Sequence, residues 1–342
     1  MSIYAAHDDG LRVVDSGQTR VETRLAGHRV ECVAVDHRVP DRVLAGTWDG
    51  LYRSDDGGTT FDRVATESLD STASDGVDAV TALAVSPADP ETVLVGTEPS
   101  GIYRSSNGGR TVQRISGLRD VPSADEWSFP PRPDTDHVRW IEVCPDDPDR
   151  WYVGIEAGAL LVTPDAGRTW VDRPAGARRD THTMATHPDE PDRVYVAAGD
   201  GYAESDDRGE TFTTPSAGPD HGYVWGLAVD AGDPDSVLVS AATGAGAAHR
   251  HGESYLYRKT NPGSSNGNTP DTDSVWERLD DHGVSTGGGT FRAVIAAGAD
   301  PGSFWVLNNR GLYRTTDGGD RFERVESSDS LPTRSARALA IV

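Results

Sequence analysis

Three features of the sequence together predict an all-β fold: one seven-bladed β-propeller, with four antiparallel strands per blade, that comprises residues 1–342 as a single domain. A short motif recurs along the chain, runs rich in β-branched residues surround each copy, and no segment keeps a helical period. Four-stranded units that repeat every roughly 40–60 residues are typical of propeller blades.

The motif has the pattern Ser/Thr-x-Asp-x-Gly-x-Thr-aromatic, and we call it the repeated turn. Five copies are recognisable, at residues 54–61, 105–112, 163–170, 205–212 and 315–322. Two degenerate copies, at residues 14–19 and between Lys259 and Trp276, bring the number to seven. Asp accepts hydrogen bonds from nearby backbone N–H groups and Gly allows positive φ, so the motif is expected to reverse the chain between two strands rather than to catalyse a reaction.

Other strands are expected at regular places before each repeated turn. The second strand of a unit is an apolar run that often ends in Gly or Ala, such as residues 43–47 and 93–97, and an Asp-Pro turn often precedes it. The first, innermost strands are predicted at residues 30–35, 80–85, 138–143, 181–186, 224–229, 291–296 and 336–341.

The two ends of the chain are expected to complete one blade together. Residues 3–6 resemble a second strand, and residues 336–341 resemble a first strand. Pairing between them would close the propeller and remove two exposed sheet edges.

The composition is strongly acidic, with 55 acidic and 32 basic residues and a formal net charge of -23. Asp accounts for 40 of the acids, and Lys259 is the single lysine. This pattern favours a halophilic protein that stays soluble in high salt, although an ordinary acidic protein is the alternative. The charge argues against nucleic acid as a partner. No apolar window approaches about 18 residues and no signal segment is apparent, so we expect no membrane span and a cytoplasmic location.

The second residues of the predicted inner strands suggest a site. If the strands align, one ring near the mouth of the channel contains Glu31, Thr81, Arg139, His182, Trp225, Arg292 and Arg337. The three arginines could bind a carboxylate or another anion, with Trp225 and His182 beside the ligand and Glu31 at the rim. Alternatively, the arginines pair with nearby acids such as Asp78, Asp136, Asp180 and Asp220.

We expect no metal and no cofactor. His249 and His251 have the spacing of a possible metal pair, but a solvated loop at residues 241–254 is the simpler interpretation. His182 and His187 would point to opposite faces of one strand. Cys32 and Cys144 are expected to be buried free thiols. The insertion at residues 116–137, which contains Trp127 and Phe129, could be a lid or could pack on a neighbouring blade.

The five copies of the repeated turn resemble the Asp-box, or bacterial neuraminidase (BNR), repeat, and the acidic composition is similar to that of haloarchaeal members. The resemblance covers nearly the whole chain. Proteins with this repeat include sialidases, two-propeller xyloglucan hydrolases, sortilin and photosystem II assembly factors. The resemblance implies the fold, and fold alone does not specify function.

Comparison with these proteins favours a non-enzymatic binding or scaffold propeller. Sialidases use an arginine triad that Arg139, Arg292 and Arg337 could imitate, but they have six blades and an Arg-Ile-Pro segment that is missing near this N-terminus. Assembly factors are similar in having one seven-bladed propeller and an arginine patch that binds protein. The expected partner is a protein, or a carboxylate-bearing or carbohydrate ligand. A glycoside hydrolase is the alternative, so the sequence leaves enzymatic activity open.

Overall fold

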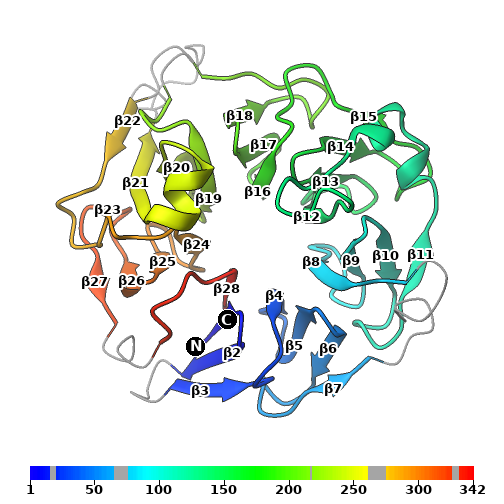
Figure 1. Cartoon of the computed structure of the whole chain (residues 1–342), viewed down its shortest axis with the longest axis horizontal. Coiled ribbons are helices and arrows are strands. Elements are labelled where there is room, and N and C mark those ends of the chain that lie inside the picture. Colours follow the sequence, from blue (N-terminus) through cyan, green and yellow to red (C-terminus); the bar gives the residue numbers. More distant parts are fainter. Residues whose placement is uncertain (16–20, 65–75, 216–217, 261–274, 326–330) are drawn as a thin grey trace. The chain divides into compact units, whose positions relative to one another are not determined.

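The computed structural model confirms the all-β, seven-bladed propeller fold with antiparallel four-stranded blades (Figure 1). It describes residues 1–15, 21–64, 76–215, 218–260, 275–325 and 331–342. The degenerate repeated turns at residues 16–19 and 261–274 lie outside these ranges. The chain forms two compact units, one comprising Met1–Pro174, Arg179–Thr181 and Arg337–Val342, the other Ala175–Arg178 and His182–Ala336.

The first unit contains four blades. In spatial order their strands are β28(Ala338–Ile341)-β1(Ser2–His7)-β2(Gly10–Asp15)-β3(Val21–Arg24); β4(Val30–Asp36)-β5(Val39–Thr47)-β6(Gly50–Ser54)-β7(Asp62–Arg63); β8(Ala79–Val85)-β9(Val93–Glu98)-β10(Ile102–Ser105)-β11(Gln113–Ile115); and β12(Val138–Val143)-β13(Trp151–Ile155)-β14(Ala159–Thr163)-β15(Val171–Asp172). Two 3-10 turns, η2 (Leu118–Asp120) and η3 (Pro122–Glu126), precede β12.

The second unit contains three blades. Their strands are β16(Thr181–His187)-β17(Glu190–Ala198)-β18(Gly201–Ser205); β19(Tyr223–Asp230)-β20(Asp233–Ala242)-β21(Glu253–Thr260)-β22(Val275–Arg278), with β23(Gly287–Gly288) also paired to β21; and β24(Val294–Ala297)-β25(Phe304–Asn308)-β26(Gly311–Thr315)-β27(Glu323–Arg324). An isolated bridge between Glu204 and Thr213 takes the place of a fourth strand beside β18. A π-helical turn, η4 (Ala247–His251), follows β20.

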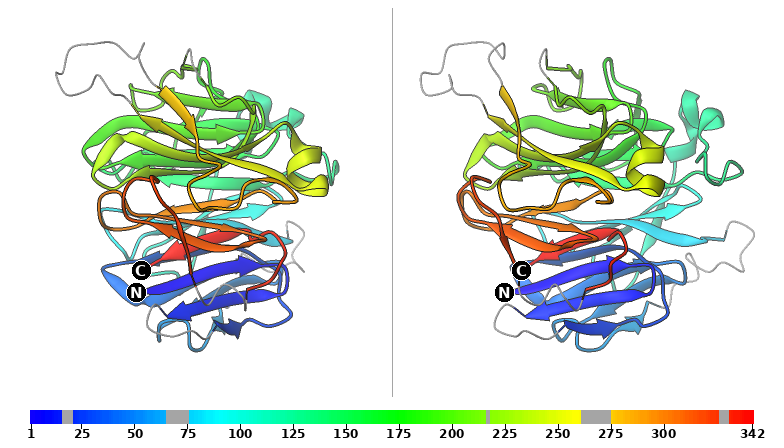
Figure 2. Two further views of the ribbon diagram at one scale, coloured as in Figure 1. Left: turned by 90° about the vertical axis from the view of Figure 1, so that its left-hand side faces the viewer. Right: turned by 60° about the vertical axis from the view of Figure 1, so that its left-hand side comes forward.

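The ends of the chain pair as the sequence predicts. Strand β28 lies antiparallel to β1, with Ile3 opposite Ile341 and Ala6 opposite Ala338 (Figures 1 and 2). The pairing continues to the last residue, because the N–H of Val342 donates to the carbonyl of Ser2 at 3.0 Å. Tyr4 and Ala6 of β1 are buried in a core shared with Val30, Val43 and Ala45. The last strand therefore covers an edge of a buried sheet.

Two predicted inner strands begin later than the sequence suggested. Strand β24 begins at Val294 rather than at residue 291, and β28 begins at Ala338 rather than at residue 336. The N–H of Phe291 donates to the side chain of Asn309 at 2.8 Å, not to a neighbouring strand. Pairing thus starts only after Arg292, whereas the N–H of Arg337, just before β28, already donates to the carbonyl of Ala6 at 2.9 Å.

Each of the five repeated turns within the described residues is held by the same hydrogen bonds. In the copy after β6, the Ser54 hydroxyl donates to Asp56 at 2.7 Å and accepts from the Gly58 N–H at 2.9 Å. Asp56 in turn accepts from the N–H of Thr60 at 2.8 Å. The other four copies repeat these contacts around Asn107, Asp165, Asp207 and Asp317. These bonds account for the Ser/Thr, the Asp and the Gly of the motif as parts of a turn.

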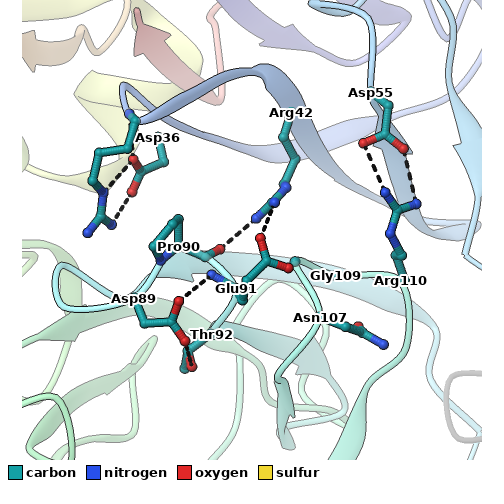
Figure 3. Close-up of polar contacts among 12 residues, drawn as sticks. Asp36, Arg42, Asp55, Asp89, Pro90, Glu91, Thr92, Asn107, Gly109 and Arg110 are labelled. Atoms are coloured by element: carbon teal, nitrogen blue, oxygen red, sulfur yellow. Dashed lines mark hydrogen bonds and ion pairs between the residues drawn. The ribbon is translucent and has the colours of Figure 1, made fainter.

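Neighbouring blades of the first unit are joined near these turns. Arg110 contacts Asp55, with a distance of 3.1 Å between Nη1 and Oδ2, and Arg42 donates to the carbonyl of Pro90 at 2.7 Å and to Glu91 (Figure 3). The strands of neighbouring blades also pack on each other, because a glycine in the second strand of one blade lets the inner strand of the next blade come close. A Cβ added to Gly96 would lie 2.5 Å from Cγ1 of Val138. The Gly that ends the second-strand run therefore marks the packing between blades.

Candidate functional site

Most of the predicted site residues lie at irregularities of the inner strands. In four blades, the pairing between the first and second strands shifts register beside the second residue of the strand. The shifts fall between Val30 and Cys32, between Val80 and Ala82, between Val138 and Trp140, and between Val224 and Leu227. Glu31, Thr81, Arg139 and Trp225 therefore sit at β-bulges, which commonly redirect side chains next to binding sites.

In the first unit, Glu31 is surrounded by donors. Its carboxylate forms an ion pair with Nε of Arg29 at 2.7 Å, and it accepts hydrogen bonds from Arg337 at 2.8 Å and from the indole N–H of Trp48 at 2.5 Å. Arg337 also contacts Asp8 at 2.6 Å. Arg29 lies over the Trp48 ring, 4.5 Å from its centroid, and burial lowers the pKa of Arg29, with Arg337 contributing. The structure thus joins Glu31 and Arg337 in one charged cluster.

Arg139 is mostly buried in the same unit and has an acidic neighbour. Its Nε lies 3.5 Å from Glu156, which also contacts Nε2 of His137 at 2.9 Å. The carboxylates of Glu156 and Asp180 are within 4.8 Å of each other. Ion pairing of the arginines, the alternative interpretation of the sequence, is therefore present: Arg337 contacts Asp8 and Glu31, and Arg139 lies beside Glu156. Asp136, named in that alternative, binds Arg119 at 2.6 Å.

The side chain of Thr81 forms a structural contact between two inner strands. Its hydroxyl is buried and donates to the carbonyl of Val138 at 2.7 Å, which links β8 to β12.

The second unit brings its three predicted site residues into contact. His182 comes from β16, Trp225 from β19, and Arg292 from the segment before β24. The ring of His182 lies 4.4 Å from that of Trp225, and the guanidinium of Arg292 lies 4.3 Å from the Trp225 centroid. His182 and Trp225 are both buried. Three separate blades therefore supply one aromatic and cationic cluster, which we call the His182 cluster.

Two further members of this cluster, Tyr223 and His249, were not among the predicted ring residues, although His249 was considered as one of a possible metal pair. The Tyr223 hydroxyl lies 2.7 Å from Nε2 of His249 and 3.5 Å from Nε2 of His182. His249 belongs to η4, whose Ala248 is buried against Tyr223 and Trp225. The loop at residues 241–254 was expected to be solvated; several of its residues are exposed, whereas His249 is only partly exposed and packs on Tyr223 and Trp225. The Ala pair before His249 was the available signal, because apolar residues in a loop indicate packing.

The insertion at residues 116–137, which connects β11 to β12, packs on the blade that follows it, formed by β12–β15. Trp127 is buried in a core with Ile141 and Ile155, and its indole N–H donates to Ser123 at 2.9 Å. Ser123 is held by Asp172 at 2.6 Å. Of the two interpretations left open by the sequence, packing accounts for Trp127. In the described part of the chain, no helix has the length and apolar character needed to cross a membrane.

Comparisons with known proteins support the fold. Residues 152–257 match the family described as the lipoprotein LpqB β-propeller domain, Gmad1. The chain is similar to the GH74 xyloglucanase from Xanthomonas campestris, with 19% identity and a TM-score of 0.66 over 99% of this chain and 52% of that one. An ancestral GH74 enzyme has 16% sequence identity and a TM-score of 0.63, over 92% of this chain and 38% of that one. The chain therefore spans about half or less of the length of these enzymes.

A smaller protein is similar over most of both chains. The structure of YCF48 bound to a D1 peptide shares 12% identity with a TM-score of 0.57, over 86% of this chain and 81% of that one. YCF48 from Cyanidioschyzon merolae has 13% sequence identity and a TM-score of 0.56, over 87% of this chain and 85% of that one. At these identities the likeness concerns the fold alone. No curated protein matches the chain significantly in sequence.

Proposed function

We propose that this chain is a non-enzymatic binding propeller that holds a carboxylate-bearing segment of a partner protein. The main support is the His182 cluster, in which Arg292 stacks on Trp225 beside His182. A stacked guanidinium is held in place and can form a bidentate contact to a carboxylate. Arg139 and Arg337, with Glu31, would serve the same ligand class in the first unit. YCF48, similar over most of its length, has been observed with a bound peptide.

The proposal includes a high-salt environment. The single lysine, Lys259, is fully buried against Glu204, so the acidic surface carries no lysine side chain. At about 1 M salt the screening length is about 3 Å, and long-range attraction disappears. Recognition would then depend on short-range contacts such as stacking and bidentate hydrogen bonds. We further propose that the repeated turns are Asp boxes of a halophilic member of that group; the cytoplasmic location stays a prediction.

The binding proposal is tested by removing two arginines. We expect Arg139→Ala combined with Arg292→Ala to abolish capture of acidic peptides in molar salt, measured by fluorescence anisotropy against a peptide library. Arg110→Ala with Arg179→Ala is the matched control, because both side chains are more than half exposed and both contact an acid. Unchanged capture by the first double variant, with an unchanged near-ultraviolet circular dichroism spectrum, would reject the proposal.

One observation favours a second candidate, a glycoside hydrolase. Glu156 and Asp180 approach to within 4.8 Å, close to the separation of about 5–5.5 Å between the carboxyl groups of retaining glycosidases. If the pair is catalytic, the chain releases sugars from xyloglucan or sialylated glycans, and Glu156→Gln stops the release. Absence of product from the wild-type chain in molar salt counts against this candidate.

A further inference from the structure

Three potential metal ligands converge in the His182 cluster. Nε2 of His249 and Nε2 of His182 lie 2.7 Å and 3.5 Å from the hydroxyl oxygen of Tyr223. The three side chains come from η4, β16 and β19, so separate elements of the second unit place them together. None of the three ligands is one of the arginines Arg139, Arg292 and Arg337 of the proposed peptide contact, but they share the His182 cluster with Arg292.

The tautomer of His182 suits a ligand. Its Nδ1 lies 2.7 Å from the backbone carbonyl of Val224, which can only accept a hydrogen bond. Nδ1 must therefore carry a proton, and in the neutral form of the ring Nε2 directs its lone pair towards the Tyr223 side. Histidines that bind metals commonly donate their other N–H to a backbone carbonyl in this way, which fixes the ring.

The spacing also suits a small cation. Ligand atoms at about 2.0–2.1 Å from a tetrahedral zinc ion are about 3.3 Å apart. The two distances from the Tyr223 oxygen, 2.7 and 3.5 Å, lie on either side of that value. The Tyr223 oxygen and Nε2 of His249 would move apart by about half an ångström for both atoms to bind one ion.

On the side of Trp225 and η4, these atoms have aromatic and apolar neighbours. Trp225 lies 4.4 Å from the ring of His182 and 4.9 Å from that of His249, between ring centroids. Ala242 and Ala248 complete the buried cluster. Such a shell limits access of water and strengthens coordination. Arg292 is the positive charge that a cation would meet there, and a phenolate at Tyr223 would supply a compensating negative charge.

We propose that His182, Tyr223 and His249 form a binding site for a divalent transition-metal ion of the zinc type. Two imidazoles and a phenol oxygen favour zinc, copper or nickel over magnesium or calcium, which prefer sets of oxygen ligands. On binding, the two neutral imidazoles each give one bond, Tyr223 gives a third, and its phenolic proton passes to solvent. A water molecule or a carboxylate of a ligand would take the fourth position.

The test is titration of Zn²⁺ alone into the tag-free, chelator-treated chain by calorimetry in molar salt. We expect one saturable site, weakened at least tenfold in His249→Ala and in His182→Ala, and weakened in Tyr223→Phe with loss of the tyrosinate ultraviolet band that zinc induces. His251→Ala is the matched control, because His251 lies in the same turn with an exposed side chain.

Two results would overturn the site: no saturable binding by the wild-type chain, or wild-type affinity in His249→Ala. Equal weakening in His251→Ala would also overturn it, by showing that the turn collects the metal nonspecifically. His249 is decisive if His182→Ala does not fold, because His249 is only half-buried. Zinc binding that survives in the Arg139→Ala, Arg292→Ala variant would separate this site from peptide capture.

Discussion

His7, at the end of β1, is an imidazole enclosed by the protein. Its exposed fraction is 1%, and neither ring nitrogen has a hydrogen-bond partner among the described residues. Burial, together with the nearby charge of Arg12, lowers the pKa of His7 from 6.5 to about 4. The folded chain therefore holds His7 as a neutral ring. Between about pH 6.5 and 4, the unfolded chain binds a proton at this residue that the folded chain does not.

This gives a prediction for acid stability. Below pH 6.5 the unfolded chain takes up a proton that the folded chain binds only near pH 4, so stability falls as the pH drops through that window. The loss attributable to His7 is roughly 3 kcal/mol. Urea unfolding between pH 7 and 4 should show a shallower decline for His7→Gln than for the wild type. His37→Gln, at an exposed histidine, should keep the wild-type slope; equal slopes for His7→Gln and the wild type would contradict the prediction.

At the scale of single elements, the strand and turn pattern was readable because each repeated turn uses local hydrogen bonds. Ser54, Asp56 and Gly58 lie within five residues, so the motif itself encodes the geometry. The β-bulges at Glu31 and Arg139 were not readable, since they depend on register with another strand. For the same reason the sequence placed Arg292 on a strand that starts only at Val294. The contact between Tyr223 and His249 depends on a loop conformation, and loops have no repeating hydrophobic pattern from which a conformation could be predicted.

The close approach between β9 and β12 gives a prediction at this scale. Gly96→Ala would place a methyl group 2.5 Å from Val138, and relief requires that the neighbouring strand moves. We expect a loss of about 1–3 kcal/mol in the free energy of unfolding, measured with urea. Gly218→Ala is the control, because a Cβ there meets no atom within 4 Å among the described residues. A loss no larger than that of the control would show that the blades tolerate separation.

For the whole molecule, the sequence predicted the blade number and the pairing of β1 with β28, and both are confirmed. The number of blades could be counted because the motif repeats, so that the clear copies reveal where the degenerate copies lie. The partners of the arginines could not be derived, since Asp8 and Arg337 are almost the full chain apart. The description of residues 1–342 as a single domain stays a prediction, as does the ligand-binding role of Glu31, Arg139, His182, Trp225, Arg292 and Arg337.

Deletion of residues 336–342 tests the pairing of β28 with β1. Removal of β28 exposes the buried edge of β1, so we expect a severe loss of stability and a tendency to aggregate, measured by thermal unfolding and light scattering. Arg337→Gln is the control that removes the contacts to Asp8 and Glu31 but keeps the strand, and it should unfold within a few degrees of the wild type. A truncated chain as stable as this control would mean that the last strand is dispensable.

The hydrogen bond between Val342 and Ser2 places the two chain ends next to each other. A short linker could therefore join them without disturbing either strand, and new ends could be made at an exposed turn of another blade. Such a circular permutant would keep every sheet while giving β28 and β1 to one uninterrupted hairpin. The permutant would change the order of the blades along the chain and leave the strand pairing within each blade unchanged.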